Sequence, residues 1–209
     1  MASCRTGSVF GAAALLGTGV IVGGMLDEAV SPAHAATAQP EEGMSQEEMM
    51  AQWIALGTPG EHHRKLDYAV GDWDVDAKFM MPGEDGVTTV GSGGTMETEW
   101  VLGGRFVQTR YHLDDMMGQP FDGIAYVGYD NAAGEYVSIW MDSMSTKAHV
   151  HRGWFEGDTF ITQGESGMGG EMRIVSKQVD DRTVVDEFYE RATPDAEWTM
   201  NGSSTYTRK

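Results

Sequence analysis

The chain has 209 residues, with 14 lysines and arginines against 32 aspartates and glutamates, a formal charge of −18 and a pI near 4.5. Such a negative surface repels nucleic-acid phosphates and anionic lipid headgroups, so we expect no nucleic-acid partner. Hydrophobic residues make up 41% and charged residues 22% of the chain, which is enough apolar material for one folded domain and excludes a disordered acidic protein.

The N-terminal segment has the pattern of an export signal. Arg5 precedes an uncharged run from Val9 to Leu26 that is rich in alanine, valine, leucine and glycine, and Ala33-His34-Ala35 then forms a small-x-small site. We therefore predict a signal peptide over residues 1–35, cleaved after Ala35, and a periplasmic or extracellular bacterial protein. The alternative is a retained membrane anchor, but glycines dilute its hydropathy and we expect no stable membrane span after processing.

Removal of residues 1–35 leaves a domain with a net charge of −17, so the acidity belongs to the mature chain. Cys4 is the only cysteine and leaves with the signal. The mature protein is thereby predicted to contain no disulfide, no thiolate metal site and no cysteine nucleophile.

Residues 36–57 are expected to form a flexible leader with one short helix. The main domain is expected over 58–209 and begins with a second helical pattern. Ser45 and Glu48 form a capping box before an apolar i/i+4 pattern that ends at Gly57. Thr58 is the expected N-cap of a second short helix, which would run towards Gly71.

From residue 72 onward the period changes to two, and turn residues recur about every ten positions. We predict strands near 72–81, 87–100, 104–113, 121–129, 135–143, 146–154, 158–164, 170–179, 183–191 and 197–207. No helical pattern separates them, so consecutive strands should pair antiparallel. The predicted fold class is all-β, an antiparallel up-and-down β-barrel of about eight to ten strands preceded by two short α-helices, with a two-sheet sandwich as the alternative.

Two sets of residues carry a resemblance to known barrels. Gly71-Asp72-Trp73 resembles the Gly-x-Trp signature of lipocalin-like (calycin) barrels, in which the tryptophan packs near a basic residue of the last strand, and Arg208 is the candidate for that partner. More closely, residues 58–209 resemble the bacterial family called domain of unknown function 1579. That resemblance rests on His63, Leu66, Gly103-Gly104-Arg105-Phe106, Met117-Gly118-Gln119-Pro120-Phe121, Gly128-Tyr129-Asp130 and Trp140-Met141-Asp142-Ser143-Met144-Ser145-Thr146. It implies a calycin-like barrel and no particular activity.

The strand near 135–143 is apolar on both faces, whereas the wall of a solvated barrel should alternate. Packing of the N-terminal helices or another subunit on its outer face is the more common explanation. In the functional interpretation Trp140 and Asp142 face inward, and Asp142 orients a small, mostly apolar ligand. We predict that Tyr126, Arg110 and His112 line the same cavity, and that Met117, in a loop at the barrel mouth, acts as a lid.

Other functions remain open at this stage. Asp142 with His112 or His149 could form the acid/base pair of a hydrolase- or isomerase-like enzyme. Alternatively, the strand near 135–143, which is apolar on both faces, or the predicted helix that ends at Gly57 could pack on a partner in a homo-oligomer. His149 and His151 have the alternate spacing of sheet metal sites, and some lipocalin-like barrels hold heme through one histidine. Histidines with this spacing are more commonly exposed surface residues, so we expect no metal or cofactor. The function that we expect is that of a non-enzymatic binder.

Overall fold

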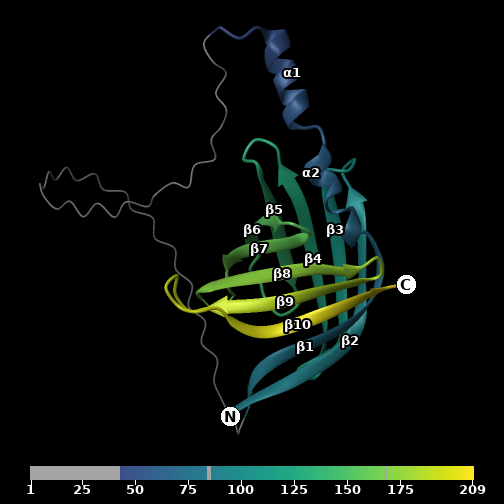
Figure 1. Ribbon diagram of the computed structural model, residues 1–209, viewed down its shortest axis with the longest axis vertical. Coiled ribbons are helices and arrows are strands. Elements are labelled where there is room, and N and C mark those ends of the chain that lie inside the picture. The colour runs from purple at the N-terminus through teal and green to yellow at the C-terminus, as the bar shows by residue number, and fades with distance from the viewer. Residues whose placement is uncertain (1–42, 84–85, 168) are drawn as a thin grey trace, which may run out of the picture. The chain divides into compact units, whose positions relative to one another are not determined.

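The computed structural model describes residues 43–83, 86–167 and 169–209, and the predicted signal peptide and leader up to residue 42 lie outside them. The described residues form ten strands, in agreement with the predicted all-β class (Figure 1). The strands are β1 Gly71–Gly83, β2 Gly86–Val101, β3 Phe106–Met116, β4 Gln119–Asp130, β5 Glu135–Asp142, β6 His149–Glu156, β7 Thr159–Glu165, β8 Glu171–Asp180, β9 Thr183–Arg191 and β10 Thr199–Arg208.

Each strand pairs antiparallel with its neighbours in sequence, and β1 also pairs with β10, so the sheet closes into a barrel. The closing register sets Trp73 opposite Arg208 and Val75 opposite Tyr206. Closure removes the unpaired strand edges that an open ten-strand meander would expose. The predicted up-and-down barrel is thus confirmed, and the sandwich alternative is wrong.

Helix α1 (Gln46–Leu56) has the expected capping box, in which Ser45 Oγ accepts from the Glu48 amide at 3.2 Å and Glu48 accepts from the Ser45 amide at 2.8 Å. The helix buries none of its residues, and Trp53 is 72% exposed. It therefore does not form the expected cover over β5. Among the described residues no helix has the length and hydropathy that crossing a bilayer requires.

The second helix differs from the prediction. It begins at Glu61, not after Thr58, and α2 (Glu61–Arg64) is followed by the 3-10 turn η1 (Asp67–Ala69). The Thr58 hydroxyl donates to the Ile54 carbonyl at 2.5 Å and so closes α1, while His63 Nδ1 accepts from the Gly60 amide at 3.1 Å. Leu66, which falls within the predicted helix, lies between α2 and η1 and is 2% exposed.

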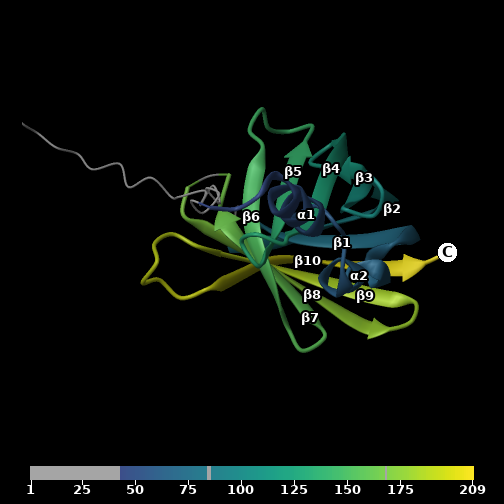
Figure 2. The same cartoon turned by 90° about the horizontal axis from the view of Figure 1, so that it is seen from above.

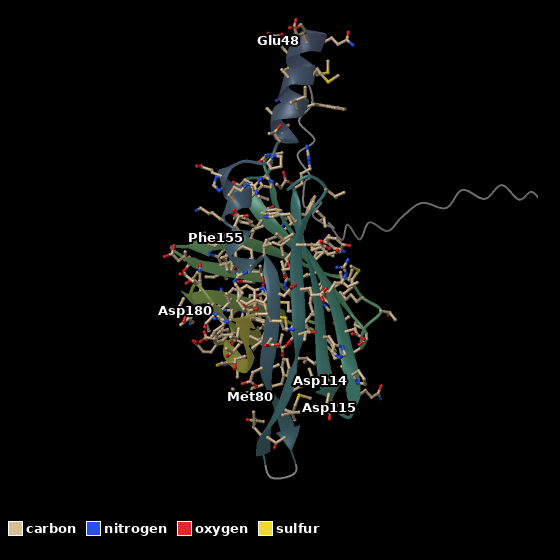
Figure 3. All side chains as sticks on the ribbon, turned by 90° about the vertical axis from the view of Figure 1, so that its right-hand side faces the viewer. Glu48, Met80, Asp114, Asp115, Phe155 and Asp180 are labelled. Carbon is tan, nitrogen blue, oxygen red and sulfur yellow. The ribbon has the colours of Figure 1, made fainter. Side chains whose placement is uncertain are left out.

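The segment from α2 to η1 covers one end of the barrel, here called the covered end (Figure 2). Leu66 packs there with Val107, Tyr136 and Phe160, and the Tyr136 hydroxyl donates to the His62 carbonyl at 2.7 Å. Burial of these side chains in water-free contact is the main force that holds the segment on the barrel. Figure 3 shows Phe155 at this end, and Met80, Asp114 and Asp115 at the opposite one, called the far end.

Trp73 and Arg208 meet at the covered end, as the lipocalin-like signature implies. The Arg208 guanidinium lies 4.1 Å from the Trp73 ring centroid and donates to the carbonyls of Val70 at 2.5 Å and Tyr68 at 2.8 Å. Gly71 has a φ of +136°, and a Cβ there would collide with Nη1 of Arg208. The glycine of the motif is therefore required by the close approach of the arginine.

Candidate functional site

The strand register decides which predicted site residues share a face. On β3, Val107, Tyr111 and Leu113 are buried and alternate with exposed Phe106 and Arg110, so the first set faces the barrel axis. Paired residues of neighbouring strands lie on the same face of a sheet, so the pairing with β3 shows in turn which residues of every other strand face the barrel axis. Trp140 and Asp142 face inward, whereas Arg110, His112 and Tyr126 face outward.

Trp140 and Asp142 form one structural unit at the far half of the barrel. The Asp142 carboxylate accepts from Trp140 Nε1 at 2.8 Å and from the Met144 amide at 2.9 Å. The Trp140 ring covers Gly123 so closely that a Cβ at that position would overlap it. Phe121 stacks on the ring at 6.2 Å between centroids. The site thus has an aromatic wall whose orientation a carboxylate fixes.

The three outward residues belong to a polar surface across β2, β3 and β4. Arg110 donates to Glu99 at 3.1 Å and to Gln108 at 3.0 Å, and Gln108 in turn bonds the Tyr126 hydroxyl. His112 Nδ1 lies 2.8 Å from Asp122. Because Asp142 points to the other side of the wall, His112 and Asp142 do not form the acid/base pair considered above.

This outer surface contains an open groove of about 300 Å³, lined by Thr95, Glu97, Arg110, Tyr111, His112, Asp122, Gly123 and Ile124. Within the groove His112 lies 2.8 Å from Asp122, and Arg110 pairs with Glu99 at its border, where both side chains are more than half exposed. Exposed pairs of this kind contribute little free energy, so the groove is a solvated outer surface, and of the three outward predicted residues Arg110 and His112 line it.

Met117 lies in a tight turn, not in the longer loop that the sequence suggests. Strands β3 and β4 extend to Met116 and Gln119, and Met117 and Gly118 between them have φ values of +57° and +86°. The Gly118 amide donates to Asp115 at 2.6 Å, and Met117 is 54% exposed. The residue therefore stands at the far end, as expected for a mouth position, on a hairpin fixed by hydrogen bonds.

The two histidines of β6 are interior residues, contrary to the surface interpretation. His149 pairs with Trp140, and His151 pairs with Ser138 and Gly164 on the inner face. His151 is only 4% exposed, and burial lowers its pKa. Their i, i+2 spacing was the available signal, but spacing alone does not say which face is inner. The described residues contain no group of three side chains suited to hold a metal ion.

Asp186 is an interior residue that sequence reasoning missed. Its carboxylate accepts from Ser176 Oγ at 2.5 Å and from the Tyr206 hydroxyl at 3.1 Å, and Tyr68 approaches the same Ser176. Desolvation raises the pKa of Asp186 to about 6, although the two hydrogen bonds oppose that rise. The row Val184, Asp186, Phe188 of β9 places an acid between two inward apolar residues, and that alternation was the signal that could have found it.

Many inward side chains retain accessible surface even though the barrel is closed around them. This holds for the residues of intermediate exposure on the inner face of β5, β8 and β9 and for their neighbours across the barrel, which include Met96, Phe121, Ser138, Trp140, Ile174, Asp186, Phe188 and Glu190. Asp186 also keeps such surface, although Ser176 and Tyr206 donate hydrogen bonds to its carboxylate. A fully packed core would leave these groups without it.

The closed antiparallel wall, the Trp73–Arg208 contact and the aromatic interior define a calycin-like barrel. Residues 58–208 match the family model described as "Protein of unknown function (DUF1579)", and the chain belongs to that family. The match confirms the resemblance found in the sequence. No curated protein matches the chain.

Proposed function

We propose that the protein is an exported, non-enzymatic binder of a small, mostly apolar molecule inside its barrel. The observation that carries the proposal is the accessible surface on inward aromatic and aliphatic side chains, since apolar walls with a few polar groups are the usual composition of small-molecule sites. The Trp140 ring, oriented by Asp142 and stacked on Phe121, supplies a flat apolar contact surface.

A first experiment expresses the full chain in a bacterial host, purifies it from the periplasm without added ligand, and records a native mass spectrum and an absorption scan. We expect a polypeptide mass that matches residues 36–209 and an adduct that leaves on denaturation. A Soret band would identify the cargo as heme. A protein that stays in the cytoplasm with residues 1–35 intact contradicts the export part of the proposal.

A second experiment titrates the protein with the fluorescent apolar probe N-phenyl-1-naphthylamine. We expect saturable binding at one site, weakened at least tenfold by Ser138→Phe, which adds volume on the inner face of β5. Ile139→Phe adds a ring on the outer face of the same strand and is the matched control. Absence of saturable binding, or equal effects of the two substitutions, contradicts an interior site.

Self-association is a second candidate function, and exposed apolar side chains support it. Met141 is 38% and Val150 57% exposed on the outer face of β5 and β6, and α1 presents Trp53 and Ile54 to solvent. Apolar surface of this extent is common at protein interfaces. Light scattering at micromolar concentration tests it, and a monomeric mass contradicts it.

A further inference from the structure

The inner surface of the barrel has a one-sided charge distribution. Asp142, Asp186 and Glu190 all point inward, by the same register that orients their strands. Among the described residues, the lysines and arginines within strands face outward, apart from Arg208. The outward set is Lys78, Arg110, Arg152, Arg173, Lys177 and Arg191. Arg208 is held at the covered end by Trp73 and two carbonyls. No lysine or arginine of the described strands therefore neutralises the far half of the interior.

In the same half of the barrel, His151 has a buried nitrogen that is not hydrogen-bonded within the described residues. Its imidazole points inward from β6, is 4% exposed, and its Nε2 atom has no hydrogen-bond partner among the described residues. The ring lies against Gly164, where a Cβ would overlap it. A buried polar nitrogen without a partner costs about 1–3 kcal/mol, which is the reason native proteins rarely leave one unsatisfied.

Two carboxylates, Asp142 and Glu190, share the inner face and the far half of the barrel with His151. Glu190 lies on β9 at the same register as His151 on β6, with Gly164 of β7 and Met172 of β8 between them. Its Oε1 accepts from Ser166 Oγ at 2.8 Å. Since burial lowers the pKa of His151, its imidazole is neutral near pH 7 and adds no positive charge to the group. The lining of the far half is thus rich in acceptors and poor in cations.

Aromatic faces complete the arrangement. Trp140 is stacked with Phe121 and meets Tyr111 edge-on at 6.0 Å between centroids. The faces of such rings carry partial negative charge and attract cations, most strongly where water is excluded. Carboxylates beside aromatic faces favour a positively charged group and disfavour an anion.

We propose, on the basis of the binding function above, that the ligand is an organic amine. Its apolar body lies against the Trp140 wall, and its ammonium group lies in the far half of the interior, where Glu190, Asp142 and His151 face inward. The acceptor-rich lining selects for a donor-bearing cation, and the aromatic wall is compatible with both the apolar body and the charge. A fatty acid or other anion of the same size would meet uncompensated carboxylates.

The test compares three probes with the same alkyl chain, hexylamine, hexanol and hexanoate, by calorimetric titration of the exported protein at pH 7.5. We expect hexylamine to bind at least tenfold more tightly than hexanol and hexanoate to bind most weakly, because a charge-assisted hydrogen bond is worth more than a neutral one. Equal binding of hexylamine and hexanol, or tighter binding of hexanoate, overturns the inference and leaves the proposed function standing. Failure of all three to bind overturns the inference, and absence of saturable N-phenyl-1-naphthylamine binding in addition overturns the proposed function.

Variants locate the ammonium group. Glu190→Gln should lower hexylamine affinity at least fivefold and hexanol affinity by a smaller factor. Asp142→Asn should also lower hexylamine affinity more than hexanol affinity, although it keeps only one of the two acceptors that bond Trp140 and the Met144 amide. Glu187→Gln is the matched control, because Glu187 lies on β9 but faces outward and bonds Lys177 at 2.7 Å. Loss of hexylamine binding in the control to the same degree as in Glu190→Gln, with circular dichroism unchanged, refutes the assignment.

Discussion

Replacing Asp186 with asparagine should stabilise the protein at neutral pH. In the folded protein the carboxyl is desolvated and its pKa is raised from 3.8 to about 6. It therefore binds its proton more tightly when folded than when unfolded, and its contribution to stability is greatest below pH 4 and declines as the pH rises to about 6. At 1.36 kcal/mol per pH unit, the difference corresponds to at most about 3 kcal/mol, less where interior water solvates the carboxylate.

Urea unfolding followed by tryptophan fluorescence at pH values from 4 to 7.5 measures this effect. The free energy of unfolding of Asp186→Asn minus that of wild type should grow by about 2–3 kcal/mol between pH 4 and 6.5 and then stay constant. Asp195→Asn removes the same charge at an exposed loop position and is the control. A difference that is independent of pH would refute the reasoning, since it would mean that the folded protein does not disfavour the ionised carboxylate.

Three further substitutions test other parts of the fold. Gly123→Ala pushes a methyl group into the Trp140 ring and should lower the free energy of unfolding by about 1–3 kcal/mol in urea, whereas Gly91→Ala meets only ordinary contacts and should not. Arg208→Met removes the stacked guanidinium and two hydrogen bonds and should cost about 2–4 kcal/mol, with faster amide exchange in η1. Ser45→Ala should reduce helical circular dichroism without changing the urea midpoint, because α1 buries no residue; a lowered midpoint would contradict this.

The strands could be predicted because their signals are local. Alternation and turn residues predict the bounds of β9, 183–191, without error. The ends of every other strand lie within three residues of their predicted positions. At the β2–β3 turn, Leu102, Gly103 and Gly104 all have positive φ values, which delays β3 to Phe106. A helix start is less local: Thr58 has the chemistry of an N-cap, but its hydroxyl is used by the preceding helix.

The site could be predicted only in part, because a strand pattern gives two faces and does not name the inner one. On β5 the acid and tryptophan share a face, so Trp140 and Asp142 were found together. On β3 the set that contains Arg110 and His112 looked functional, yet the opposite set of Val107, Tyr111 and Leu113 is the one that excludes water. The inner face is set by the free energy gained when apolar side chains are buried and by the cost of burying Arg110 and His112 without partners.

The two halves of the barrel treat polar groups in opposite ways. At the covered end every feature that the Gly-x-Trp motif brings together is satisfied: Trp73 Nε1 donates to the Ala69 carbonyl at 3.0 Å, and Arg208 bonds two more carbonyls. Towards the far end, His151 Nε2 has no hydrogen-bond partner within residues 43–83, 86–167 and 169–209, and no lysine or arginine of the described strands faces inward beside Asp142 or Glu190. A sequence selected for stability alone would replace such groups with apolar ones of similar volume. Their presence on one side of the interior is a cost that binding of a complementary ligand would offset, which is the physical reason to place the function of the barrel in that half.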